Sequence, residues 1–213
     1  MGELITERFT FDGGRDVTLY VPSAPVQAIL YCGDGQLLPH WGDDIERQDG
    51  LPSTMIVGVH RLADETLRLH EYSANFDPDR FAAHEEFVTG PLRAWVDATY
   101  AVNLPPDQCS VFGVSASGEF ALAMGARHPD VFGVVLSASP GAGYKPSDGV
   151  IDKMPPTYLV AGRQEPFFLE NATRWAMALR DCGQKVVLET RDAGHDDGMW
   201  RAELPKMMAW AFT

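Results

Sequence analysis

The sequence of 213 residues has little of three things: long apolar runs, basic side chains and cysteine. No apolar run approaches the roughly 20 residues that a membrane-spanning helix needs. The first residues, MGELITERFTFDGG, contain acidic side chains and none of the apolar stretch that a secretory signal requires. We therefore expect neither a membrane segment nor a leader peptide.

Basic residues are fewer than acidic ones: the chain has 17 Lys and Arg and 30 Asp and Glu, which gives a net charge of −13. Nucleic-acid-binding proteins neutralise phosphates with Lys and Arg, so this balance argues against nucleic acid and against anionic membrane surfaces as partners. The cysteines Cys32, Cys109 and Cys182 lie far apart and form no C-x-x-C pair. Such a sparse set is typical of small buried hydrophobes in a reducing compartment, which predicts a cytoplasmic protein.

Apolar runs alternate with helix-like stretches along the whole chain. Two runs, ELITERFTF and DVTLYVP, have the pattern of an antiparallel pair that is joined by Asp12-Gly13-Gly14. The later runs are typical of buried parallel strands: VQAILYC, STMIVGVHR, CSVFGV, VFGVVLSAS, PTYLVAG and KVVLETR. Together they predict a single α/β domain over residues 1–213, with about eight strands that are mostly parallel.

Helices are expected between most of these runs. Their expected ranges are 79–100 with a kink at Gly90-Pro91, 116–128, 167–182, and about 198–212 with an interruption at Pro205. The segments 33–52 and 140–155 are rich in Gly, Pro and Asp, and we interpret them as surface loops near a site.

The stretch VFGVSASGEF, residues 111–120, passes from a strand-like run into a helix-like one through glycine and small residues. A strand that turns into a helix through Gly-x-Ser-x-small is a nucleophile elbow, which exposes the central serine at the end of a sheet. Ser115 has this central position. The usual pattern carries glycine two residues later, where this chain has Ser117 followed by Gly118. The alternative interpretation is an ordinary serine in a glycine-rich bend.

A nucleophilic serine needs a base, an acid that orients the base, and donors for the oxyanion. His195 is the best-placed base, because it lies in DAGHDDG between the last strand-like run and the last helix. The acid should follow PTYLVAG, where GRQEP offers Glu165, and Asp192 is the competitor, along with Asp196 and Asp197. A metal hydrolase that uses His195 with Asp196 and Asp197 is the weakest alternative, because three ligands on one loop match no zinc spacing. We expect no metal and no cofactor.

The oxyanion donors should be two backbone amides. One is the amide of the residue after the nucleophile, Ala116. The other should come from the loop YCGDGQ, residues 31–36, through the amide of Gln36 or Gly35, although a plain turn explains this loop equally well.

The segment GVSASGEFALAMGARHPDVFGVVLSAS resembles the elbow, helix and next strand of the Putative esterase family of α/β-hydrolases. This family includes enterochelin esterases, esterase D-like hydrolases and, more distantly, mycolyltransferases. YCGDGQ is similar to its Y-L-L-D-G loop, RLHEY to its Arg-x-x-Glu-Leu/Tyr segment, and AGHDDGMWRAELPKMMAW to its G-G-H-D-x-x-x-W ending. The resemblance extends over about residues 28 to 212.

The resemblance implies an α/β-hydrolase fold without a large lid, and roles for the matching residues. Ser115 is then the nucleophile and His195 the base, while Ala116 and Gln36 supply oxyanion amides. Glu165 matches the acid, although some relatives work largely as a Ser–His pair. Ser117 departs from the pattern, and the N-terminal domain of the large enterochelin esterases has no counterpart, which argues against a siderophore substrate.

The function expected from these residues is hydrolysis of a small carboxylic ester through an acyl-enzyme. The alternatives are an acyltransferase that uses the same acyl-enzyme, and a catalytically silent binding protein with a hydrolase fold. Arg68 could contact a substrate carboxylate, or form a structural ion pair with Glu71 or another acid. Candidates for lining a compact pocket are the aromatic residues Trp41, Tyr144, Phe167, Phe168 and Trp200.

Overall fold

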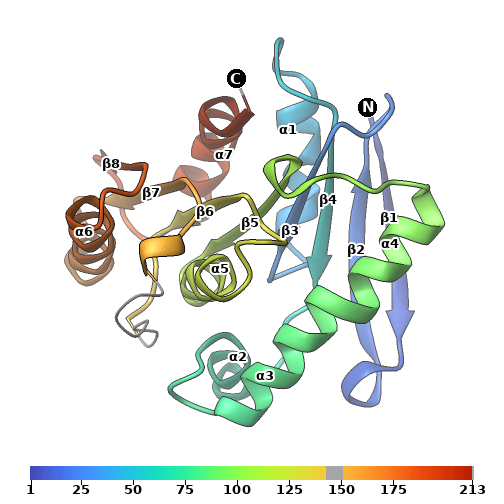
Figure 1. Ribbon diagram of the computed structural model, residues 1–213, viewed down its shortest axis with the longest axis horizontal. Helices are drawn as coiled ribbons and strands as arrows, with labels where there is room; N and C mark the ends of the chain where they lie inside the picture. Colours follow the sequence, from blue (N-terminus) through green and yellow to red (C-terminus); the bar gives the residue numbers. More distant parts are fainter. Residues whose placement is uncertain (143–150, 213) are drawn as a thin grey trace.

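The computed structural model describes residues 1–142 and 151–212 (Figure 1). Within these residues eight strands form one sheet, in the order β1-β2-β4-β3-β5-β6-β7-β8. Strand β2 pairs antiparallel with β1 and with β4, and all the other pairs are parallel. This confirms the predicted fold class. The strands are β1 (Glu3–Phe9), β2 (Arg15–Val21), β3 (Ala28–Cys32), β4 (Thr54–Val59), β5 (Cys109–Val114), β6 (Val134–Ala138), β7 (Thr157–Gly162) and β8 (Val186–Arg191).

The central strands are buried along their whole length and mostly apolar, because both faces of the sheet are covered by helices. Successive side chains point to opposite faces, so Ile29 and Val111 lie in one core cluster while Leu30 and Phe112 lie in the other. The first cluster receives side chains from α2, α3, α4, α5 and α6, and the second from α1 and α7. The helices are α1 (Gly42–Glu46), α2 (Glu65–Tyr72), α3 (Pro78–Phe87), α4 (Arg93–Tyr100), α5 (Ala116–Arg127), α6 (Pro166–Asp181) and α7 (Asp197–Phe212).

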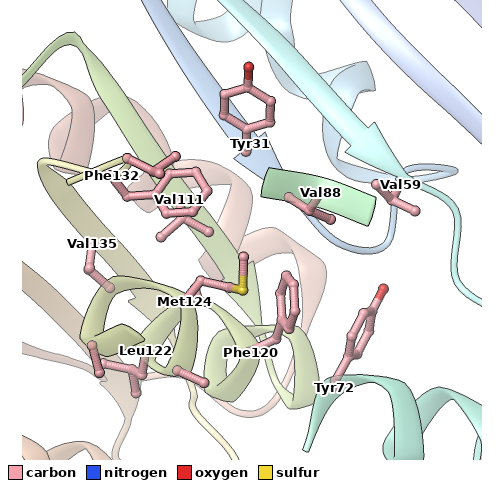
Figure 2. Packing of buried hydrophobic residues seen from close by; sticks show 14 of the residues in the cluster. Tyr31, Val59, Tyr72, Val88, Val111, Phe120, Leu122, Met124, Phe132 and Val135 are labelled. Carbon is pink, nitrogen blue, oxygen red and sulfur yellow. The ribbon is translucent and has the colours of Figure 1, made fainter. Parts of the chain in front are cut away.

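Helix α5 lies at the centre of the first cluster, directly after β5. Figure 2 shows Phe120 and Met124 of α5 near Val111 of β5, with Tyr72 of α2 beside Phe120. The rings of Tyr72 and Phe120 are 5.5 Å apart, and Leu122 is fully buried. Burial on nearly all sides holds the start of α5, and therefore the residues of the turn before it, in one position.

Three sequence-based expectations need correction. The segment 33–52 is not a plain surface loop, because a 3₁₀ turn at Leu38–Trp41 and helix α1 follow one another there and bury Leu38 and Trp41. The expected kink at Gly90-Pro91 is a π-helical turn, Val88–Leu92, between α3 and α4. Pro205 does not interrupt the last helix, since α7 continues through it.

Helix α2 was not expected from the sequence, and it begins with a well-formed cap. The carboxylate of Asp64 accepts hydrogen bonds from the amides of Thr66 and Leu67, which satisfies two of the free N–H groups at a helix start. The helix ends at Tyr72, whose side chain is completely buried. No helix in residues 1–142 and 151–212 has the length and apolar character to cross a membrane.

Candidate active site

Ser115 lies on the turn between β5 and α5 with a strained backbone, φ 58° and ψ −122°. Such a conformation costs about 1–3 kcal/mol for a residue other than glycine and persists only where its surroundings enforce it. The Ser115 amide donates to the carbonyl of Ala138 at 3.0 Å, and the Ser115 carbonyl accepts from the amides of Gly118 and Gly141, both at 3.1 Å. These three bonds fix the turn, and the hydroxyl faces His195 where Ser115 lines a pocket.

Gly113 provides the space that this turn needs. A Cβ atom at Gly113 would lie 1.9 Å from the carbonyl oxygen of Ser117, because the first turn of α5 packs directly on β5. The next position of the motif, Ser117, carries a side chain without a clash. Gly33 of the neighbouring loop leaves room for this side chain, because a Cβ atom on Gly33 would lie 3.1 Å from the Ser117 Cβ, which is closer than ordinary packing.

His195 lies between Ser115 and Glu165. Its Nε2 is 3.0 Å from the Ser115 Oγ, and its Nδ1 is 2.5 Å from the Glu165 Oε2. Since a carboxylate accepts hydrogen bonds, Nδ1 carries the proton and Nε2 is free to accept one from Ser115. Phe168 stacks on the imidazole at 3.9 Å, and the Trp200 ring meets it edge-on at 4.7 Å. The two aromatic rings restrict the orientation of the imidazole.

The loop that carries His195 is fastened to the end of β7. The amide of Gln164 donates to the carbonyl of Ala193 at 3.0 Å. Gly162 allows this approach, because a Cβ atom there would lie 2.1 Å from the same carbonyl oxygen. The close contact places His195 over Glu165, which begins the turn into α6.

Glu165 is 5% exposed and its two carboxylate oxygens have separate partners. While Oε2 faces His195, Oε1 accepts from the Gly162 amide and from the Ser139 hydroxyl, both at 2.6 Å. Ser139 in turn accepts from the indole N–H of Trp200 at 2.8 Å. These bonds fix the position of the carboxylate beside His195.

The other acidic candidates lie elsewhere. The Asp192 carboxylate accepts from the side-chain amide of Gln164 at the surface. Asp196 accepts from the amide of Met199 at 3.1 Å and so caps α7, while Asp197 is exposed at the rim of the pocket. In the part of the chain that the structure describes, no three His, Cys, Asp or Glu side chains are grouped as a metal ion would require.

The structure distinguishes between the amides of Gly35 and Gln36, the two candidate oxyanion donors in the loop after β3. The Gly35 amide donates to the Val59 carbonyl at 2.8 Å, so it is not free for a substrate. A Cβ atom on Gly35 would lie 2.0 Å from the Gly58 carbonyl oxygen, and this close approach explains the glycine. Gln36 lines the pocket beside Ser115. Among the described residues, the backbone amides of Gln36 and Ala116 donate to no backbone carbonyl in a turn, loop or helix cap.

Arg68 lines the same pocket, but its guanidinium group forms an ion pair with Asp34. Its Nε and Nη2 donate to the two carboxylate oxygens of Asp34 at 3.1 and 3.0 Å. Burial alone would lower the pKa of Arg68, but the hydrogen bonds to Asp34 raise it. Arg68 therefore pairs mainly with Asp34, and more distantly with Glu65 at 3.6 Å, while Glu71 pairs with Arg15 at 2.7 Å.

The pocket has a volume of about 470 Å³ and opens beside Ser115 and His195. Of the aromatic candidates for its lining, Trp200 lines it, Trp41 is part of the core, and Phe167 is exposed. Phe168 packs on His195, and Tyr144 lies outside the described residues. A volume in this range is typical of sites for small molecules.

Sequence reasoning missed two groups of this site. Ser139, which supports Glu165, has a detectable signal, since it directly follows strand β6 at the carboxyl end of the sheet. The sequence signal for Asp34 is weaker, because it is only a single acidic residue between two glycines in YCGDGQ. Its partners come from two distant segments, so only the folded chain reveals them.

Comparison with known proteins gives a family and several solved structures with the same fold. The family model described as "Putative esterase" matches residues 29–153. A ferulic acid esterase is 16% identical, with all of this chain and 98% of that one covered and a TM-score of 0.78. The BES protein from Bacillus cereus is 15% identical, with 99% and 94% covered and a TM-score of 0.79. No curated protein sequence gives a significant match.

A larger relative shares the fold over part of its length. The enterobactin esterase FES from Shigella flexneri, solved in the presence of enterobactin, is 22% identical with a TM-score of 0.80. The alignment covers 98% of this chain but only 59% of that one. At these identities the likeness establishes the α/β-hydrolase fold.

Proposed function

The chain belongs to the Putative esterase family, and on that premise we propose that it is a serine esterase that hydrolyses small carboxylic esters through an acyl-enzyme. The observation that carries the proposal is the line of hydrogen bonds from Ser115 through His195 to Glu165. A nucleophile, a base and an orienting acid in this order are the requirements of acyl transfer by serine.

In the first half of the proposed reaction, the Ser115 Oγ attacks the ester carbonyl as the His195 Nε2 takes the hydroxyl proton. Glu165 accepts the Nδ1–H of His195 and stabilises the imidazolium that forms. The developing oxyanion receives hydrogen bonds from the amides of Ala116 and Gln36. The proton then passes from Nε2 to the leaving alcohol, and the C–O bond of the ester breaks.

In the second half, water attacks the acyl-enzyme along the same path. His195 takes a proton from the water and returns it to the Ser115 Oγ as the new carboxylic acid leaves. The pocket beside Ser115 favours compact acyl groups, since its volume of about 470 Å³ is modest.

The proposal is tested with a fluorophosphonate probe and a panel of p-nitrophenyl and aryl esters. We expect one label per chain at Ser115, with neither labelling nor turnover in Ser115→Ala. Ser110→Ala is the matched control, because the hydroxyl of this buried serine on β5 donates to the Ile29 carbonyl and Ser110 is not among the residues that line the pocket. Labelling at a different residue, or turnover that survives Ser115→Ala, would refute the proposed nucleophile.

A further inference from the structure

Ser117 stands where the elbow motif usually has glycine, and its hydroxyl is fully buried. The Val114 amide donates to the Ser117 Oγ at 2.9 Å. The hydroxyl has a single proton and two acceptors within reach, the Asp34 Oδ2 at 2.7 Å and the Val114 carbonyl at 2.9 Å. A carboxylate is the stronger acceptor, and 2.7 Å is the length of a charge-assisted O–H···O⁻ bond. Ser117 therefore donates to Asp34.

Asp34 is held on every side at the start of the loop that carries Gln36. Arg68 donates hydrogen bonds to both carboxylate oxygens of Asp34. The backbone amide of Asp34 donates to the Tyr72 hydroxyl at 2.8 Å. The Asp34 carbonyl accepts from the amide of Leu37 at 2.8 Å, which closes the turn that contains Gln36. Asp34 also has a positive φ of 48°, so the chain changes direction at this residue. Its position thus sets the position of the Gln36 amide.

The Ser117–Asp34 bond joins two segments that each present one oxyanion amide. Ala116 directly precedes Ser117 on the elbow, and Gln36 lies two residues beyond Asp34. The two bonded side chains are 83 residues apart in the chain. We propose that Ser117 and Asp34 are positioning residues whose hydrogen bond sets the distance between the two oxyanion donors. This inference rests on the proposed function.

The size of the effect follows from how an oxyanion hole works. Donors contribute fully only when each lies about 2.7–3.1 Å from the oxyanion, and complete loss of one donor costs about 10²–10³ in kcat. Without the Ser117 hydroxyl, the bond from Gly35 to Val59 still fastens the loop to β4. The donors are then misplaced rather than lost. We expect kcat to fall by about tenfold to a hundredfold, with KM within about twofold of the wild-type value.

The test compares Ser117→Ala and Ser117→Gly with Ser137→Ala. Ser117→Ala keeps the Cβ atom and removes the hydroxyl, while Ser117→Gly restores the usual motif residue if the alanine variant does not fold. Ser137 is the matched control, because it is an equally buried serine whose hydroxyl bonds to the Gly118 carbonyl in the same turn of α5. That bond does not involve Asp34.

Two rates are measured for each variant. The first is the second-order rate constant for labelling by a fluorophosphonate, whose phosphonyl oxygen occupies the oxyanion position and which requires no natural substrate. The second is kcat, with KM, for p-nitrophenyl acetate. Both Ser117 variants should lose labelling rate and kcat together. Ser137→Ala should lose thermal stability while it keeps both rates.

The outcomes separate this inference from the proposal on which it rests. Labelling of both Ser117 variants at the wild-type rate would overturn the inference alone, and so would equal slowing in Ser137→Ala. Failure of the wild-type protein to label at Ser115 would overturn the proposed function and this inference with it. A raised KM at unchanged kcat would assign Ser117 to substrate binding and overturn the positioning role.

Discussion

Replacing Glu165 by glutamine should impose the wrong tautomer on His195. In the wild-type protein, Oε1 of Glu165 accepts hydrogen bonds from the Gly162 amide and the Ser139 hydroxyl, both at 2.6 Å. Because both groups donate, the side-chain oxygen of the glutamine takes the place of Oε1. Its NH₂ group then faces the His195 Nδ1 in place of the carboxylate oxygen. An amide nitrogen can only donate, so Nδ1 must become an acceptor and the imidazole proton moves to Nε2. A protonated Nε2 cannot take the proton of Ser115.

The magnitude follows from the loss of this base. Imposing the wrong tautomer costs about 10⁴ in kcat in a serine enzyme of another fold. We expect a loss of about 10³–10⁴ here, or about 4–5.5 kcal/mol, because Phe168 and Trp200 keep the ring in place and only its tautomer changes. KM should change little, since Glu165 is not among the residues that line the pocket.

The assay is steady-state hydrolysis of p-nitrophenyl acetate by Glu165→Gln, with circular dichroism to show that the variant folds. Asp192→Asn makes the same change at the surface, where the carboxylate accepts from the side-chain amide of Gln164, and should stay within about twofold of the wild-type rate. A slower Asp192→Asn than Glu165→Gln would assign the acid to Asp192. Two near-neutral variants would leave Ser115 and His195 as a pair without an acid.

Two further predictions concern stability and substrate size. Burial alone would raise the pKa of Glu203, but hydrogen bonds from Arg191, Tyr158 and Lys206 lower it below 4.5. Its contribution to stability is therefore fully present above pH 4.5 and is lost as the pH falls through the lower folded value. Glu203→Gln should cost about 1.5–3 kcal/mol in urea unfolding at pH 7 and less near pH 3. An equal loss of unfolding free energy at pH 7 and pH 3 would contradict the lowered pKa of Glu203. Acetate and butyrate esters should turn over faster than dodecanoate and hexadecanoate esters, and the reverse order in a p-nitrophenyl series would exclude a compact pocket.

The strands and the outline of the site could be predicted from the sequence because their signals are local. Mostly apolar runs such as CSVFGV indicate strands that are buried on both faces, and the structure has β5 there. The elbow is a contiguous motif, so its geometry depends on residues that adjoin Ser115. Positions at the carboxyl ends of parallel strands meet at one edge of the sheet, which is why Glu165 and His195 could be named as candidates.

The rest of the site depends on contacts between distant segments. Nothing near Ser117 in the sequence indicates that its hydroxyl meets Asp34, since the pairing needs β3 and β5 to be neighbours in the sheet. The burial of the segment after β3 was missed for a different reason. Leu38, Trp41 and Ile45 have helical spacing and are all buried, but the surrounding Gly, Pro and Asp residues outweighed this short pattern.

Backbone strain concentrates where strands leave the sheet at the site. Asp34, Ser115 and Ser139 follow β3, β5 and β6, and all three have positive φ angles between 48° and 58°. Aspartate tolerates this region better than most residues, while serine needs external support. The support comes from bonds that extend the sheet beyond the strand ends, because Ser115 donates to the Ala138 carbonyl and Ser139 to the Val160 carbonyl. The same three residues supply the proposed nucleophile, a hydrogen-bond partner of the proposed acid and the anchor of the loop that carries Gln36. Each sharp turn thus directs a polar group over the edge of the sheet, and the extended ladder keeps those groups at fixed distances from one another.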